Sequence, residues 1–296
     1  MNKIINDLQV LGLSTKNSLS LYNARTRDMD NLNVLKCNKS DVIVLEEMRL
    51  REDYYDSSEH YHDANKNLLK KKDETINIFP LNDDQRRFDN YKELIANKSL
   101  LDFGSGKGEF LRLCNDIVES CAGVELEGYN RRAINQSGIE CTKNLDDLTG
   151  RKFNVITLNH VFEHLIRPLD YIIKLADHLE DDGTLIIEVP HARDLLLSYF
   201  DLQEFKDFTF WSEHLILHTK ESLEKFVTYK NKFKVKKIAG FQRYPITNHY
   251  HWLYKREPSG HNYYSQLNDD EFHKSYSSYL EKFNMTDTII GFFGKS

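Results

Sequence analysis

The chain is poor in cysteine, with four among its 296 residues, and no two of them form a Cys-x-x-Cys pair. This absence removes the paired thiols on which small zinc modules and disulfide frameworks depend. We therefore predict a reduced protein, in which the cysteines that flank apolar segments are small buried residues. The four cysteines are Cys37, Cys114, Cys121 and Cys141, and the last three lie beside such segments.

The chain also lacks an excess of positive charge and a long apolar run. Its formal net charge is −6 at pH 7, whereas binding to nucleic acid regardless of sequence needs a basic field. No uninterrupted apolar stretch is long enough to span a bilayer, and polar residues break the apolar pattern of Met1–Leu13, so we identify no signal peptide. We expect a cytoplasmic protein without nucleic-acid partners, and the sequence is compatible with a homodimer.

From Ser99 onward, apolar runs typical of buried strands alternate with segments of helical periodicity. This alternation predicts an α/β doubly wound fold with parallel strands and crossover helices. The predicted strands are residues 100–103, 121–126, 139–142, 154–158, 184–189, 233–238 and 287–293. We predict four regions: an N-terminal cap (1–95), a core (96–242), an insertion over the active site (243–284) and a final core strand (285–296).

The segment that follows Leu100 joins the first core strand to a helix through three alternate glycines, Gly104, Gly106 and Gly108. Glycines at such a junction let the backbone approach a ligand closely. Glu125, at the end of the second strand, can accept hydrogen bonds from ribose hydroxyls, which suits a nicotinamide dinucleotide and other nucleoside cofactors equally. Asp102 discriminates between them, because a carboxylate is unfavourable beside a pyrophosphate and acceptable beside a cation.

Asp102–Gly108 resembles motif I of the class I methyltransferases that use S-adenosyl-L-methionine (SAM), a cofactor with a sulfonium and an ammonium group. Gly123–Leu126, Asn159–His164 with Pro168, and Leu179–Pro190 are similar to the later motifs of that family. The resemblance covers roughly residues 98–242 and the closing strand. It implies a Rossmann-like fold with a mostly parallel, seven-stranded sheet, and SAM as cofactor with S-adenosyl-L-homocysteine as product.

The same resemblance implies a set of cofactor-binding residues. The glycine turn would approach the methionine moiety and the ribose, Glu125 would hold the ribose hydroxyls, and Leu126 would flank the adenine. For Leu126, a core contact is the alternative. The full set is Asp102, Phe103, Gly104, Ser105, Gly106, Gly108, Glu125, Leu126, Asn159 and His160.

Two further segments, Glu188–His191 and Ser212–Leu215, resemble sugar-modifying methyltransferases of bacterial glycan and antibiotic pathways. Gln242–Pro245 and Asn248–Leu253 are similar to a subset associated with surface-polysaccharide clusters, such as those for capsule. Some sugar C-methyltransferases carry an N-terminal zinc module with paired cysteines. This chain has only Cys37 in that region, and the departure weakens the case for C-methylation.

The resemblance implies O-methylation of a sugar or nucleotide-linked glycan precursor in cell-surface polysaccharide biosynthesis. C- or N-methylation of a related substrate, including a phosphoramidate-type glycan modification, is an alternative within the same class. Two alternatives from other classes are a SAM-binding scaffold without catalysis and a nicotinamide oxidoreductase.

A hydroxyl acceptor must lose its proton as well as align with the methyl group. His214 is the predicted base, polarised by Glu213, and a structural histidine bonded to the backbone is the alternative. Residues 241–252 combine the side-chain types that bind sugars by hydrogen bonding and stacking. The predicted acceptor-binding residues are Arg243, Tyr244, Asn248, His249 and His251.

Two pairs of histidines have spacings that a metal site could use. His249 and His251 would share a face of an extended segment, and His160 and His164 would share a face of a helix. We expect acceptor contact for the first pair, which has no clear third ligand, and packing or cofactor contact for the second. No metal ligand and no divalent-metal requirement are therefore predicted.

Two roles stay open between a functional and a structural assignment. Arg243 would either clamp a phosphate of a nucleotide-linked sugar or pair with a surface acid. The tyrosines of the N-terminal region would either form part of a lid over the cofactor or pack under a loop-rich cap. They are Tyr54, Tyr55 and Tyr61.

Overall fold

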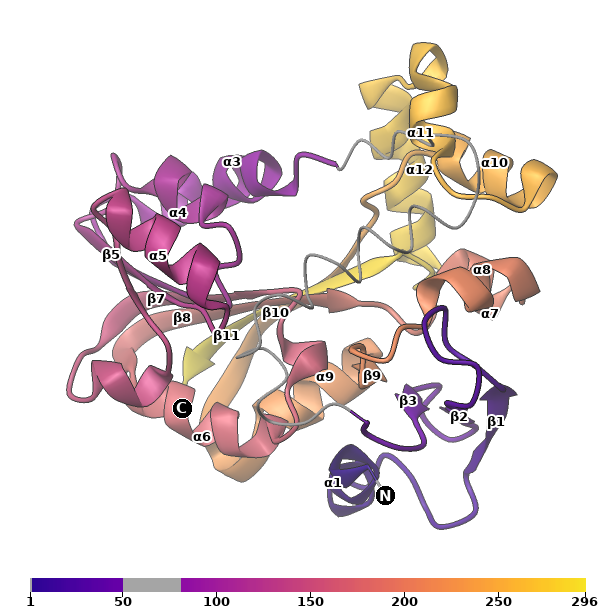
Figure 1. Cartoon of the computed structure of the whole chain (residues 1–296), viewed down its shortest axis with the longest axis horizontal. Coiled ribbons are helices and arrows are strands. Elements are labelled where there is room, and N and C mark those ends of the chain that lie inside the picture. Colours follow the sequence, from indigo (N-terminus) through magenta and orange to yellow (C-terminus); the bar gives the residue numbers. More distant parts are fainter. Residues whose placement is uncertain (1, 50–80) are drawn as a thin grey trace.

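A seven-stranded sheet forms the centre of the structure, a computed structural model that describes residues 2–49 and 81–296 (Figure 1). Its strands follow the order β10-β11-β8-β7-β4-β5-β6. All neighbouring pairs from β8 to β6 are parallel, whereas β11 is antiparallel to both β8 and β10. The predicted doubly wound, mostly parallel fold is confirmed. The strands are β4 (Ser99–Phe103), β5 (Ser120–Val124), β6 (Glu140–Thr142), β7 (Phe153–Asn159), β8 (Leu179–Pro190), β10 (Phe233–Phe241) and β11 (Thr288–Lys295).

Helices cover both faces of this sheet (Figure 1). On one face lie α3 (Asp83–Ile95), α4 (Glu109–Cys114) and α5 (Gly128–Gln136), and on the other α6 (Pro168–Asp177) and α9 (Lys220–Val227). Pro168 occupies the first turn of α6, where no N–H partner is needed, and Thr219 caps α9 in a capping box with Ser222. Because helices cover both faces, the central strands are buried on both sides and their sequences are continuous apolar runs.

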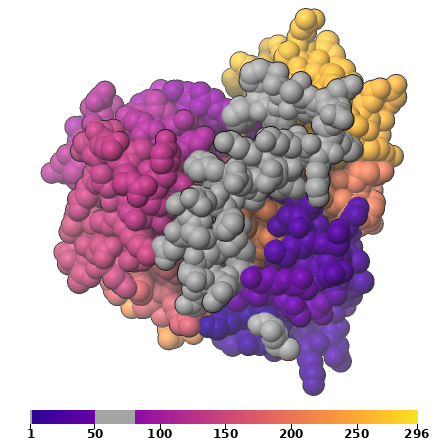
Figure 2. Space-filling model, viewed as in Figure 1, coloured from indigo at the N-terminus to yellow at the C-terminus, as the bar shows by residue number. Residues whose placement is uncertain are grey.

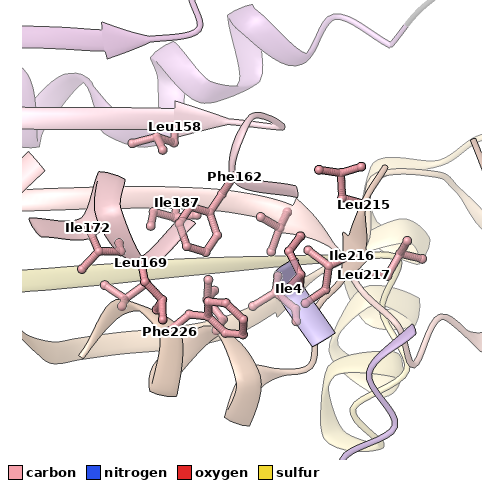
Figure 3. Close-up of a cluster of buried hydrophobic side chains, with 14 of the residues drawn as sticks. Ile4, Leu158, Phe162, Leu169, Ile172, Ile187, Leu215, Ile216, Leu217 and Phe226 are labelled. Carbon is pink, nitrogen blue, oxygen red and sulfur yellow. The ribbon is translucent and has the colours of Figure 1, made fainter. Parts of the chain in front are cut away.

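The N-terminal residues form a second, antiparallel sheet in the order β1-β2-β3-β9. Its elements are β1 (Leu19–Asn23), β2 (Val34–Cys37), β3 (Ile43–Leu45) and β9 (Ile216–Leu217), and α1 (Lys3–Val10) precedes them. Figure 3 shows Ile4 of α1 beside Ile216 and Leu217, within the cluster of buried side chains that also contains Phe162 and Phe226. The N-terminal segment therefore shares one hydrophobic core with the central sheet.

Residues 243–284 are largely helical, and the extended segment expected around His249 and His251 is not found there. Their helices, α10 (Ile246–Lys255), α11 (Gly260–Tyr263) and α12 (Asp270–Lys282), lie beside α7 (Leu195–Ser198) and α8 (Gln203–Thr209) (Figure 1). Figure 2 shows this segment, in yellow, as a projection at the upper right of the molecule. Residues two apart on a helix point in different directions, so the shared face predicted for the two histidines is wrong.

One strand starts earlier than predicted, and short 3-10 turns occur that were not predicted from the sequence. The strand predicted at 184–189 begins earlier, at Leu179, and residues 180–183 interrupt its pairing, since Phe153 of β7 pairs with Leu179 and Val155 pairs with Thr184. Within residues 2–49 and 81–296, the 3-10 turns are η2 (Leu145–Leu148), η3 (Phe162–His164), η4 (Tyr229–Asn231) and η5 (Ser265–Leu267).

Other sequence expectations concern the cysteines, the membrane and the lid. All four cysteines are free thiols, and Cys121 is only partly buried, unlike the other three. Among the described residues, no helix is long and apolar enough to cross a membrane. The candidate lid residues Tyr54, Tyr55 and Tyr61 lie outside the described residues.

Candidate functional site

Three alternate glycines shape the turn between β4 and α4. Gly104, Gly106 and Gly108 have φ angles of 80°, 52° and 76°, in the left-handed region that other residues rarely adopt. A Cβ atom on Gly104 would lie 2.4 Å from Val161 Cγ2, whereas one on Gly106 would meet nothing within 4 Å. Gly104 is therefore required by conformation and by space, and Gly106 leaves an open approach to the backbone.

Glu125 joins the glycine turn to the loop after β5. Its carboxylate accepts hydrogen bonds from the backbone N–H groups of Gly106 and Glu127, each at 2.7 Å. Burial raises the pKa of Glu125, and the two hydrogen bonds act in the opposite direction. Because a carboxylate has about four lone-pair sites, Glu125 can still accept hydrogen bonds from a ligand.

A cleft opens beside the turn and α3. Asp102 accepts hydrogen bonds from Thr157 Oγ1 at 2.6 Å and Asn159 Nδ2 at 3.3 Å, yet burial raises its pKa to about 6. Asn159 Oδ1 is buried and has no hydrogen-bond partner among the described residues, so it can accept a hydrogen bond from a ligand. The cleft is lined by Asp84, Arg87, Asp102, Gly104, Ser105, Gly106, Lys107, Glu109, Phe110 and Asn159.

Two lining residues, Asp84 and Arg87, come from α3, and neither was predicted from the sequence. Arg87 and its neighbour Arg86 donate to Oε1 of Glu188, near the end of β8, at 2.9 and 2.7 Å. Burial of Glu188 opposes its ionisation, but a hydrogen bond from His160 and the two guanidinium groups hold its pKa well below the usual range. The consecutive arginines were the one available signal in a helix that precedes the first motif.

Phe103 and Leu126 face different surroundings. The ring of Phe103 packs edge-to-face on Tyr171 of α6, with centroids 5.4 Å apart, inside the main core cluster. Phe103 can therefore contact a ligand in the cleft only through its backbone. Leu126 is 40 % exposed, which leaves its side chain accessible and disagrees with the alternative of a core contact.

Imidazole and carboxylate groups gather directly after Asn159, at the carboxyl end of β7. His160, with a φ of 54°, places Nδ1 3.1 Å from Glu163 Oε1 and Nε2 3.2 Å from Glu188 Oε1. Burial raises the pKa of Glu163, but the hydrogen bond from His160 and the neighbouring imidazoles outweigh it and lower this pKa to about 2. His160 precedes η3, so Glu163 rather than a shared helix face links it to His164.

His214 joins this cluster from a distant part of the chain. Glu163, His164 and His214 each offer a ligand atom within 4.8 Å of the other two, and the two imidazole centroids are 4.9 Å apart. Burial and the neighbouring His164 lower the pKa of His214 to about 3, so its imidazole is neutral at pH 7. The structure places the Glu163 carboxylate beside His214. The predicted carboxylate partner of His214 was Glu213, and Glu163 was not predicted in this role.

The N-terminal segment holds the loop that carries His214. Ser212 donates to the Asp28 carboxylate through its backbone N–H at 3.0 Å and through Oγ at 2.5 Å. On the other side of His214, the Leu215 N–H donates to the Glu163 carbonyl at 3.0 Å. These bonds on both sides fix the loop against η3, so the closeness of His214 and Glu163 is built into the backbone.

The predicted acceptor-binding residues contact their own segment and α3. Arg243 forms an ion pair with Asp83 of α3, and both side chains are mostly buried, so this acid is not the surface partner expected. Trp252 of α10 packs between Phe205 and Phe208 of α8, with centroids 5.0 and 5.2 Å away. The other four make these contacts: Tyr244 and Asn248 with His261, His249 with Tyr276, and His251 with Tyr263.

Comparison with solved structures finds methyltransferases. A SAM-dependent methyltransferase from Archaeoglobus fulgidus is 20 % identical over 71 % of this chain and 90 % of its own, with a TM-score of 0.47. DesVI of Streptomyces venezuelae is 21 % identical over 36 % of this chain and 50 % of its own, with a TM-score of 0.32. The sugar N-methyltransferase KedS8 of a Streptoalloteichus species is 26 % identical over 34 % of this chain and 44 % of its own, with a TM-score of 0.30. The chain thus spans half of DesVI and less than half of KedS8.

Comparison by sequence gives two further findings. No curated protein matches the chain. A family model described as a methyltransferase domain matches residues 79–234, which is more than half of the chain and includes the glycine turn, Glu125 and the histidine cluster. The chain belongs to this methyltransferase-domain family.

Proposed function

We propose that the chain methylates a hydroxyl group of a sugar or nucleotide-linked glycan precursor in bacterial cell-surface polysaccharide biosynthesis. The observation that carries this proposal is the cluster of His160, Glu163, His164 and His214, whose first member directly follows the cleft residue Asn159. Such a cluster offers groups that bind a hydroxyl and assist the loss of its proton, which O-methylation requires. The resemblance of the segments around Glu188 and His214 to sugar-modifying methyltransferases supports the acceptor class.

The cleft residues fit SAM. The unpartnered Asn159 Oδ1 suits an ammonium donor, and the open space at Gly106 admits a ligand against the backbone. In this proposal Glu125 accepts hydrogen bonds from the ribose hydroxyls, Leu126 flanks the adenine, and the glycine turn lies along the methionine moiety. When bound, SAM supplies an electrophilic methyl group on a positively charged sulfur.

Methyl transfer is an in-line displacement, so the main task of the chain is to align the acceptor. With SAM bound, the acceptor oxygen would form a bond to the methyl carbon as the carbon–sulfur bond breaks, the electron pair would pass to sulfur, and the hydroxyl proton would pass to solvent. We place His214 beside this hydroxyl, with Glu163 in the orienting position that was predicted for Glu213. A pKa of about 3 makes the free imidazole a weak base at pH 7, because general bases work best near the ambient pH.

Residues 243–284 are proposed to cover the acceptor. The support is the packing of Trp252 on α8, since α8 leads directly into the loop that carries His214. Exposed tyrosines of this segment, Tyr250 and Tyr254, offer aromatic faces on which a sugar can stack. Arg243 can bind a phosphate of a nucleotide-linked sugar only if its ion pair with Asp83 opens.

Replacing Glu125 with alanine is expected to weaken SAM binding by about 1–3 kcal/mol, the cost of leaving buried hydrogen-bonding groups unpaired. Calorimetric titration with SAM measures this change. Glu119→Ala, at an exposed position before β5, is the matched control and should bind SAM as the native chain does. Unchanged affinity in a folded Glu125→Ala chain would remove this residue from the ribose role.

The acceptor class is tested by incubating the chain with methyl-labelled SAM and a panel of nucleotide sugars and glycan fragments. We expect label in at least one sugar, and mass spectrometry with NMR of the product should place the methyl group on oxygen. A methyl group on carbon or nitrogen would overturn O-methylation while keeping the acceptor class. Label only in acceptors that contain no sugar would overturn the acceptor class.

A further inference from the structure

We propose that Glu163, His164 and His214 together bind a divalent transition-metal cation at the carboxyl end of β7. Each residue offers one ligand atom, and these atoms all lie within 4.8 Å of one another. In a tetrahedral site with metal–ligand bonds of about 2.1 Å, ligand atoms lie roughly 3.4 Å apart. The three ligand atoms must therefore approach one another to reach that separation when a cation binds.

The donor set indicates which cation fits. Two imidazoles and one carboxylate leave at least one coordination position open, as in catalytic zinc sites with three protein ligands. Imidazole nitrogen suits zinc and its neighbours in the first transition row, whereas Mg²⁺ prefers oxygen ligands and keeps several waters. We therefore assign the site to Zn²⁺ or a neighbouring transition-metal ion.

The Glu163 carboxylate supplies a second, independent observation. Its side chain is fully buried, and Oε2 has no hydrogen-bond partner within the part of the chain that the structure describes. A buried, unpaired carboxylate oxygen is costly, because it has lost water and gained nothing in exchange. A cation held between Glu163 and the two histidines would satisfy this oxygen.

The groups around the three residues hold them in a position suited to binding. The Trp211 ring packs against both imidazoles, with centroids 6.5 Å from His164 and 5.6 Å from His214. With the backbone bond from Leu215 to Glu163, these contacts pre-organise the ligands.

The role of the cation rests on the proposed function. A hydroxyl of the acceptor would fill the open coordination position, where the cation acts as a Lewis acid and lowers the pKa of that hydroxyl. The proton then leaves to solvent, and the oxygen is ready for the displacement described above. No metal was predicted from the sequence because neither pair of histidines close in the chain has a clear third ligand, whereas this site combines His164 with His214 across the fold.

Metal binding is tested on the full chain after removal of metals with a chelator. Co²⁺ is titrated by visible absorption and Zn²⁺ by calorimetry. We expect one Co²⁺ per chain, with ligand-field bands that Zn²⁺ displaces and Mg²⁺ at the same concentration does not. His214→Ala and Glu163→Gln should each weaken Co²⁺ binding by more than about tenfold. His273→Ala, on α12, is the matched control and should bind Co²⁺ as the native chain does.

Circular dichroism and SAM titration establish that each variant is folded. If Glu163→Gln does not fold, the Co²⁺ affinity of His214→Ala, a change at a partly exposed position, tests the site. Native Co²⁺ affinity in His214→Ala, or no Co²⁺ binding by the native chain, would overturn the site. Methylation of a sugar at an unchanged rate by the metal-free chain would overturn the role of the cation and retain the proposed function. Co²⁺ bound at these three residues, with no sugar methylated by the Zn²⁺-loaded chain, would retain the site and overturn the proposed function.

Discussion

Replacing Glu188 with glutamine is expected to lower the free energy of unfolding by about 3–5 kcal/mol, the range for removing one partner of a buried ion pair. Glu188 is fully buried and accepts hydrogen bonds from Arg86 and Arg87, and His160 lies 3.2 Å from the same oxygen. Glutamine keeps the shape but leaves cationic groups without their counter-charge. Urea unfolding at pH 7 measures the change.

The effect of Glu188→Gln should depend on pH in one direction. The pKa of Glu188 is held well below 4.5, its ordinary value, so the stabilisation by this carboxylate is complete above pH 4.5. It is lost as the pH falls through the lowered pKa of the folded chain. The difference between native and Glu188→Gln chains should therefore shrink below pH 4.5.

Asp89→Asn is the control, since Asp89 pairs with Lys92 on the same helix and both side chains are about half exposed. Solvent screens such a pair, so its loss should leave the unfolding midpoint unchanged. A Glu188→Gln chain as stable as the Asp89→Asn chain would show that the buried ion pair does not stabilise the fold.

Replacing Gly104 with alanine is expected to cost about 2–4 kcal/mol of stability, from the left-handed backbone and from the steric overlap of the new methyl group. The overlap is with Val161, whose Cγ2 would lie 2.4 Å from the added Cβ. A branched side chain has little freedom to rotate away. Urea unfolding without SAM isolates this cost from any effect on the cofactor.

Two further variants separate the strain from the overlap. Gly106→Ala carries a similar backbone strain, but its Cβ meets nothing within 4 Å, so it should lose about 1–2 kcal/mol. Adding Val161→Ala to the Gly104→Ala chain should recover the stability lost to steric overlap, while the loss caused by backbone strain remains. If Gly104→Ala and Gly106→Ala lose the same stability, the contact with Val161 does not explain why glycine is needed.

The central sheet could be predicted from the sequence because its strands are buried on both faces and leave continuous apolar runs. The glycine turn could be predicted for a related reason, since only glycine tolerates its backbone angles. Both are local signals. The helices between Ile246 and Lys282 gave no such signal, because segments such as Asn248–His251 alternate polar and aromatic residues without an apolar period of 3.6.

The histidine cluster could be predicted only in part. His160, Glu163 and His164 are neighbours in the chain, but nothing local shows that Glu163 lies beside His214. That contact depends on the Ser212 bonds to Asp28 and the Leu215 bond to Glu163, which together join three distant segments. Arg86 and Arg87 were missed because charged residues on a helix usually indicate a solvated face, whereas here both reach the buried Glu188.

The position of β9 far along the chain from β1, β2 and β3 affects folding during synthesis. β3 pairs with residues 216–217, so the ribosome releases the N-terminal strands long before the strand that completes their sheet. Until then Ile43 and Val44 form an apolar strand edge without its native partner, and such edges can pair with other chains. A nascent chain that stalls before Ile216 is therefore expected to aggregate unless a chaperone protects that edge.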